Sequence, residues 1–192
     1  VAMPWIKKVP AVIQGWFIGS ESGNALASIL VGDANPSGKL PFSWMQSLEQ
    51  YGAHALGAYP GKWRNDGKII DEEYKEDIFV GYRWADQHKQ KPLFPFGHGL
   101  SYTTFEYAGK SRIEKSADDT SLFTLHTSIK NTGDREGAET VQLYIRDVKS
   151  SLPRPVKELK GFQKLTLAPG EQRDITFTID KSMLSYYDDS KG

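Results

Sequence analysis

The sequence predicts a mixed fold, in which the C-terminal part of an α/β domain is followed by an all-β sandwich. Two observations lead to this prediction. Residues 1–50 read as strand, helix and strand with long apolar runs, whereas residues after 100 show repeated two-residue alternation between turn signals. In addition, all five tryptophans lie before residue 85, so the two parts differ in composition as well as in periodicity.

Residues 1–50 carry the pattern of a buried strand-helix-strand unit. Residues 9–17 form a nearly continuous apolar run, which predicts a strand buried on both faces, as in a parallel sheet. Residues 25–31 place their apolar side chains at helical spacing. Residues 39–44 are predicted to form a short edge strand, because Pro41 cannot donate to a ladder. One helix cannot cover both faces of a sheet, so we expect the rest of the α/β domain to lie outside this chain.

The charged residues are distributed unevenly. The chain contains 24 basic and 24 acidic residues, so its net charge is zero and no field would attract nucleic acid. No apolar run approaches the length of a membrane span, which is about 20 residues. We therefore expect neither a nucleic acid nor a membrane as partner. The first fifty residues carry only six charges, which indicates a surface covered by protein: Lys7, Lys8, Glu21, Asp33, Lys39 and Glu49.

Residues 51–97 are predicted to form an irregular, aromatic-rich connection. Long connections without secondary structure are usually functional or disordered, and the aromatic residues argue against disorder. Near its end lies the hinge stretch, residues 92–107, in which two prolines exclude a helix. Gly97 and Gly99 flank His98 and allow backbone angles that other residues avoid. We expect His98 to form hydrogen bonds with the backbone there.

Residues 98–192 predict a β-sandwich. Apolar and polar residues alternate at 123–129, 141–145 and 175–179, residues 160–167 are a further candidate strand, and turn residues follow at 131–134 and 168–171. The absence of cysteine and of tryptophan from this part argues against an immunoglobulin domain and favours a fibronectin type III-like one. We count about five strands where about seven are usual, so the last strand is expected to be missing.

Four blocks of the sequence resemble glycoside hydrolase family 3, and bacterial β-glucosidases in particular. The first block, residues 15–41, begins Gly-Trp-Phe-Ile-Gly-Ser-Glu-Ser-Gly, and the second, residues 74–84, contains Ile-Phe-Val-Gly-Tyr-Arg-Trp. The third, residues 92–105, contains Phe-Gly-His-Gly, and the fourth, residues 154–162, contains Arg-Pro-Val-Lys-Glu-Leu-Lys-Gly-Phe. The blocks occur in the family's order and are spread across nearly the whole chain.

The resemblance implies an architecture and a reaction. Family members join a barrel to an α/β sandwich domain and often to a fibronectin type III-like domain, and this chain would be the end of the second and most of the third. The implied reaction is retaining hydrolysis by two carboxylates, releasing glucose from the non-reducing end of β-glucosides. By this resemblance, the nucleophilic aspartate would lie in the barrel and the acid/base glutamate upstream of residue 15, so we assign no catalytic residue in this chain. The implied partners are the barrel, the remaining α/β domain and a β-glucoside. This portion would be structural and would line the cleft.

Several acidic side chains are candidates for a catalytic role. Glu21 lies at a predicted helix start, where a negative charge has a structural role. Four more acids crowd the connection and could in principle form a pair, but adjacent acids more often form a solvated face: Glu72, Glu73, Glu76 and Asp77.

Aromatic and histidine side chains complete the candidates. Trp63, between Lys62 and Arg64 in the connection, is the candidate substrate-binding residue, while packing is the favoured role of Trp5, Trp16, Trp44 and Trp84. The four histidines share no metal-ligand spacing, and residues 19–23 lack the lysine of a phosphate loop. We therefore expect no metal and no cofactor.

Two alternatives remain open from the sequence. One is a non-catalytic carbohydrate- or protein-binding module, against which the charge-poor residues 1–50 argue. The other is the same family acting on another sugar, such as xylose. The family resemblance also leads us to expect a periplasmic or secreted location.

Overall fold

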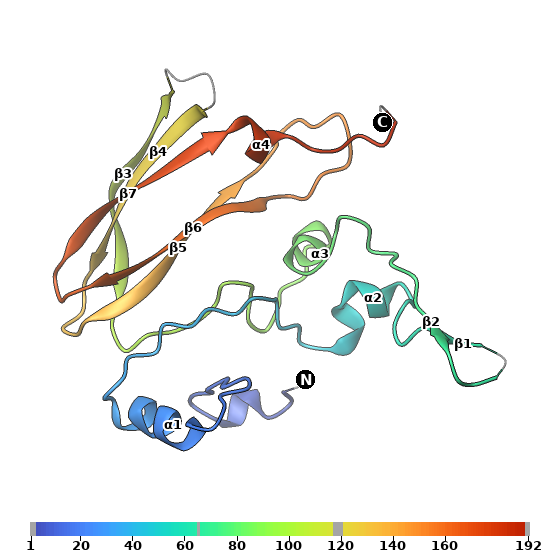
Figure 1. Cartoon of the computed structure of the whole chain (residues 1–192), viewed down its shortest axis with the longest axis horizontal. Helices are drawn as coiled ribbons and strands as arrows, with labels where there is room; N and C mark the ends of the chain where they lie inside the picture. The colour runs from blue at the N-terminus through green and yellow to red at the C-terminus, as the bar shows by residue number, and fades with distance from the viewer. Residues whose placement is uncertain (1–2, 65, 117–120, 191–192) are drawn as a thin grey trace. The chain divides into compact units, whose positions relative to one another are not determined.

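The computed structural model describes residues 3–64, 66–116 and 121–190 (Figure 1). The chain divides into two compact units. Unit 1 comprises Val1–Val31, Gly38–Leu100 and Ile145–Glu158, and unit 2 comprises Gly32–Ser37, Ser101–Tyr144 and Leu159–Gly192. Each unit therefore includes a short segment from the part of the chain that mainly forms the other.

Unit 1 consists of short helices and one small hairpin. Its buried apolar side chains include Trp44, Met45, Trp84 and Ala85. Every helix that the described residues form is too short or too polar to span a lipid bilayer. The elements are η1 (Ile6–Lys8), α1 (Ser22–Val31), η2 (Leu48–Gln50), α2 (Gly52–Ala55), β1 (Lys62–Trp63), β2 (Ile70–Asp71) and α3 (Tyr82–Gln87).

The helix predicted at 25–31 is confirmed as α1, which begins three residues earlier, at Ser22. Its first main-chain bond runs from Ala25 N to Glu21 O at 3.0 Å. The Glu21 carboxylate accepts a hydrogen bond from Asn24 Nδ2 at 2.6 Å. Glu21 thus lies where the helix dipole favours negative charge, as the sequence predicts.

The two strands predicted in residues 1–50 are wrong for this chain. Residues 9–17 form neither helix nor strand, because a strand needs a neighbour for its N–H and C=O groups and the described residues supply none to this segment. Phe17 is fully exposed there. In residues 39–44 only Trp44 forms a bridge, to Phe94, since Pro41 interrupts any longer ladder.

The hinge stretch runs beside residues 40–44. Trp44 N donates to Phe94 O at 2.7 Å, Leu40 N donates to His98 O at 2.8 Å, and Gly97 N donates to Leu40 O at 2.8 Å. The backbone bonds predicted for His98 are made by its main chain, whereas its ring stacks on that of Phe94 with 5.1 Å between centroids. These bonds hold residues 94–98 of the hinge stretch against residues 40–44 within unit 1.

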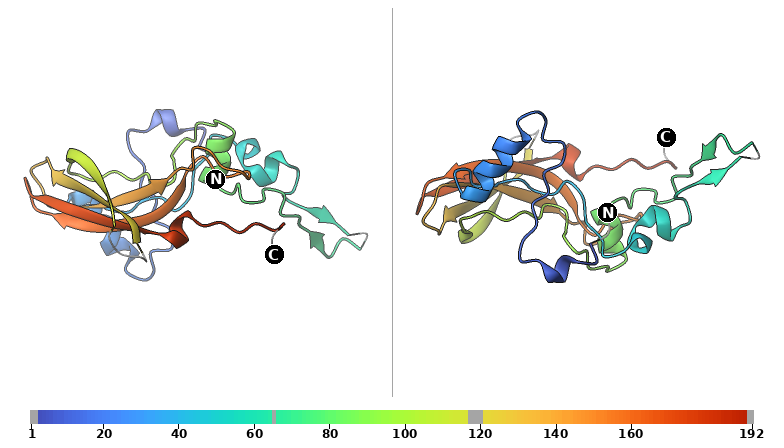
Figure 2. Two further views of the ribbon diagram at one scale, coloured as in Figure 1. Left: turned by 90° about the horizontal axis from the view of Figure 1, so that it is seen from above. Right: turned by 90° about the horizontal axis from the view of Figure 1, so that it is seen from below.

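Unit 2 contains a β-sandwich of two sheets that face each other (Figures 1 and 2). One sheet has the order β3-β4-β7 with antiparallel neighbours, and the other pairs β5 with β6. Among the described residues there are five sandwich strands, the number counted from the sequence. They are β3 (Phe105–Lys115), β4 (Ser121–Asn131), β5 (Gly137–Ile145), β6 (Glu158–Leu167) and β7 (Gln172–Asp180), and α4 (Lys181–Leu184) follows.

The hydrophobic core of unit 2 lies between its two sheets. Ile129 of β4, Leu167 of β6 and Ile175 of β7 are almost completely buried. A Cβ added to Gly161 of β6 would lie 3.3 Å from the Phe177 ring of β7, so the sheets approach closely there. Phe123 at the start of β4 is exposed. The alternation predicted for β4, β5 and β7 is otherwise confirmed, because these apolar members are buried in the core: Ile129, Val141, Leu143, Ile175, Phe177 and Ile179.

Candidate functional site

Trp63 lies on a small hairpin within the predicted connection. Strands β1 and β2 pair antiparallel, with Lys62 opposite Asp71 and Trp63 opposite Ile70. The turn is closed by Arg64 N donating to Ile69 O at 2.9 Å. The Trp63 residue is 61% exposed, so much of its indole is available to a ligand.

The chain enters the hairpin through a tight approach at Gly61. Its φ of 89° is a left-handed conformation that favours glycine. An added Cβ would overlap Ile70 Cγ2 and would lie 2.7 Å from Asp71 O. Only glycine at position 61 leaves room for Ile70 and Asp71 of β2 to pack this close to the start of β1.

Ion pairs neutralise several charges around the hairpin. Arg64 Nε lies 2.9 Å and 3.1 Å from the two carboxylate oxygens of Asp71. Lys75 Nζ lies 2.7 Å from Glu73 Oε2, and its hydrogen bond and charge hold the pKa of Glu73 below its ordinary value. The hairpin thus presents an aromatic face beside carboxylates that are paired with basic side chains, which suits contact with a sugar ring better than proton transfer.

The four acids that follow the hairpin turn to different neighbours. Glu73 pairs with Lys75, whereas an added Cβ on Gly52 would overlap Glu76 Oε1 at the start of α2. The Cγ atom of Glu72 lies near Gly61. Asp77 adopts a left-handed backbone conformation, with a φ of 52°. These contacts do not bring any two of the four acids together as a catalytic pair.

The other tryptophans and the possible metal ligands are characterised by their burial and grouping. Trp44 and Trp84 are buried, as predicted for packing residues, whereas Trp5 and Trp16 are exposed. The described residues hold no group of three or more histidine or acidic side chains placed to bind a metal ion. Sequence reasoning missed the Arg64–Asp71 pair, because only the hairpin brings these two residues together.

Comparison with known proteins identifies the class. The family model for the glycosyl hydrolase family 3 C-terminal domain matches residues 1–102. The family model for the fibronectin type III-like domain matches residues 139–192. These matches place the chain among the glycoside hydrolases. It belongs to glycoside hydrolase family 3, which confirms the resemblance seen in the sequence and the mixed fold with a fibronectin type III-like part.

The relatives are β-glucosidases. The chain is 47% identical over 193 residues to one from Bacteroides ovatus, covering 100% of this chain and 25% of the relative. It is 47% identical to the thermostable β-glucosidase B of Acetivibrio thermocellus, covering 97% and 24%. The structure of β-glucosidase 3B from Thermotoga neapolitana in complex with glucose matches with a TM-score of 0.85 and 34% identity, covering 95% and 24%. The chain thus spans about a quarter of the length of these relatives.

Proposed function

We propose that this chain is part of a β-glucosidase that releases glucose from the non-reducing end of β-glucosides with retention of configuration. The observation that carries the proposal is the 47% identity, over the whole chain, to a β-glucosidase of Bacteroides ovatus. In retaining glycosidases one carboxylate forms a glycosyl-enzyme intermediate, while another acts first as an acid and then as a base. We also propose a periplasmic or secreted location, which fractionation of the producing cells would test.

We further propose that both catalytic carboxylates lie outside these residues, in a barrel and the rest of an α/β domain. A glycosidase acid needs a raised pKa. Hydrogen bonds stabilise the ionised forms of four carboxyl groups and lower their pKa values, which does not suit them to act as the acid: Glu49, Glu73, Glu171 and Asp180. The exposed apolar side chains of residues 9–18 and 30–31 would be covered by that polypeptide.

The full-length protein should cleave an aryl β-glucoside and form β-glucose first. Retention requires two inversions at the anomeric carbon, so the first product keeps the substrate's configuration. Proton NMR during the first minutes of reaction distinguishes this product from α-glucose, and an aryl β-xyloside tests the other sugar. Release of α-glucose first would contradict retention, and absence of hydrolysis would favour a binding module. The chain of residues 1–192 alone should be inactive.

Replacing Trp63 by alanine in the full-length protein should raise KM for the aryl β-glucoside about 3- to 10-fold, with kcat changed less. An aromatic contact contributes about 0.5–1.5 kcal/mol beyond area burial, and each 1.4 kcal/mol corresponds to about tenfold in affinity. Steady-state kinetics measure the effect. Trp63→Phe is the matched control, because it keeps a flat ring. An unchanged KM in Trp63→Ala would remove this residue from the proposed cleft.

A further inference from the structure

Ion pairs at the first residue of β6 join two distant segments of unit 1. Glu158 Oε1 lies 3.2 Å from Nη2 of Arg83 on α3, and Glu158 Oε2 lies 2.5 Å from Nη2 of Arg154. The side chains of Glu158 and Arg154 are only 14% and 12% exposed, so salt and water screen this pair weakly, whereas the Arg83 side chain is 35% exposed. Further along α3, Asp86 Oδ2 lies 3.4 Å from Lys157 Nζ. The segment before β6 is therefore held against α3 at two points.

Arg83 also contacts the chain that follows the hairpin. Its Nη1 donates to Ile78 O at 3.4 Å. The preceding residue, Asp77, has a φ of 52°, which residues other than glycine adopt uncommonly. One guanidinium thus links the Glu158 carboxylate to a backbone turn that needs external support.

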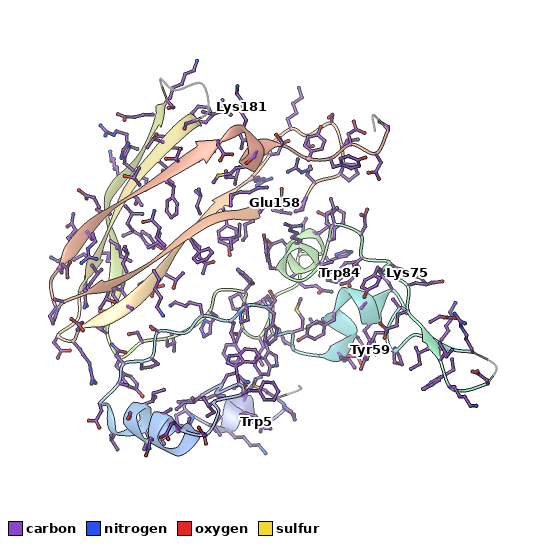
Figure 3. The ribbon with its side chains drawn as sticks, in the orientation of Figure 1. Trp5, Tyr59, Lys75, Trp84, Glu158 and Lys181 are labelled. Carbon is purple, nitrogen blue, oxygen red and sulfur yellow. The ribbon has the colours of Figure 1, made fainter. Side chains whose placement is uncertain are left out.

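The next residue of α3, Trp84, lies beside Gly52, where the two ends of the segment that carries the hairpin come together. Trp84 is buried, and its side chain and that of Glu158 are labelled beside α3 in Figure 3. A Cβ added to Gly52, at the start of α2, would lie 2.8 Å from Trp84 Cδ2 and would overlap Glu76 Oε1. Residues 52 and 76 bracket the hairpin, so the two ends of this segment meet each other, and the Gly52 end lies against Trp84 of α3.

We propose that Glu158 is a positioning residue for the hairpin that carries Trp63. Its carboxylate orients Arg83 and so fixes α3, and α3 fixes the two ends of residues 52–76 through Trp84 and the Ile78 carbonyl. Glu158 acts through Arg83 and has no contact of its own with substrate. The inference rests on the proposed function for its effect on sugar binding, and adds a residue distant in sequence to that site.

The test uses Glu158→Gln in the full-length protein, since glutamine keeps the shape and removes the charge. Hydrogen exchange of the amides in residues 61–75 should become about tenfold faster, because local opening is less opposed. KM for the aryl β-glucoside should rise about fivefold, with kcat within about twofold. Arg83→Met, which keeps the Arg154–Glu158 pair, should give the same pattern. Glu171→Gln, which removes a carboxylate paired with Arg173 in unit 2, should change neither quantity.

Two results would overturn the proposal. One is unchanged exchange of residues 61–75 in both Glu158→Gln and Arg83→Met. The other is a higher KM in Trp63→Ala with no change in Glu158→Gln. If hairpin exchange rises while neither Trp63→Ala nor Glu158→Gln alters KM, the positioning contact holds and the proposed sugar contact of Trp63 fails.

Discussion

Replacing Gly99 by alanine is expected to destabilise unit 1 by about 3 kcal/mol. The added Cβ would overlap the carbonyl oxygen of Gly38 and would lie 3.1 Å from its carbonyl carbon. These are backbone atoms, so no side-chain rotation can relieve the clash. Separating the two segments would weaken the bond from Leu40 N to His98 O and the bond from Lys39 Nζ to Gly99 O, which are 2.8 Å and 2.7 Å long.

Tryptophan fluorescence during urea unfolding measures this effect. All five tryptophans lie in unit 1, so their emission reports on that unit. Gly38→Ala is the matched control, because a Cβ there would meet no atom within 4 Å and Gly38 is outside the left-handed region. It should shift the free energy of unfolding by less than about 0.5 kcal/mol. Equal unfolding midpoints for the two variants would contradict the expected clash.

Gly97 and Gly99 illustrate what local sequence can predict. Gly97 has a φ of 80°, which confirms the expectation that a residue there needs glycine's freedom. Gly99 requires glycine for another reason, the close approach of Gly38. A sequence pattern reveals a backbone angle within a turn, but a contact with a distant segment depends on the fold.

The strands also differ in whether local sequence or distant contacts determine them. Alternation predicted β4, β5 and β7, because one face of each strand is buried within unit 2. The sequence missed most of β3, since the register shift between Ala108 and Arg112 breaks the two-residue period. Residues 9–17 have a strand's composition without a strand partner among the described residues, and composition cannot show whether a partner is present.

The candidate site was predictable only in part. Trp63 stood out because it is an aromatic residue between two basic ones in an irregular connection. The Arg83–Glu158 contact joins residues far apart in the chain, and charged residues at such a separation have no sequence signature. Asn131 is a further example. The sequence marks it as a turn residue, whereas the structure buries it completely.

Replacing Asn131 by alanine is expected to destabilise unit 2 by about 4 kcal/mol. The Asn131 side chain makes four hydrogen bonds. Nδ2 donates to Arg135 O at 2.7 Å and to Leu167 O at 3.0 Å, and Oδ1 accepts from Thr103 Oγ1 at 2.7 Å and from Gly133 N at 3.1 Å. Alanine would leave these groups without their Asn131 partner in the interior, and each such group costs about 1–3 kcal/mol.

Hydrogen exchange of the amides of β4, β6 and β7 measures the loss in unit 2, which has no tryptophan. Thr132→Ala is the control, because it removes only the exposed 2.9 Å bond to Thr104 and should cost less than about 0.5 kcal/mol.

Asn131→Asp separates hydrogen bonding from volume. Burial would raise the pKa of the introduced carboxyl in the folded state above its unfolded value. The variant should therefore be most stable below the unfolded pKa, and should lose stability as pH rises through the folded pKa. Stability independent of pH in Asn131→Asp, or equal exchange in Asn131→Ala and Thr132→Ala, would show that the four bonds contribute little to holding the sandwich together.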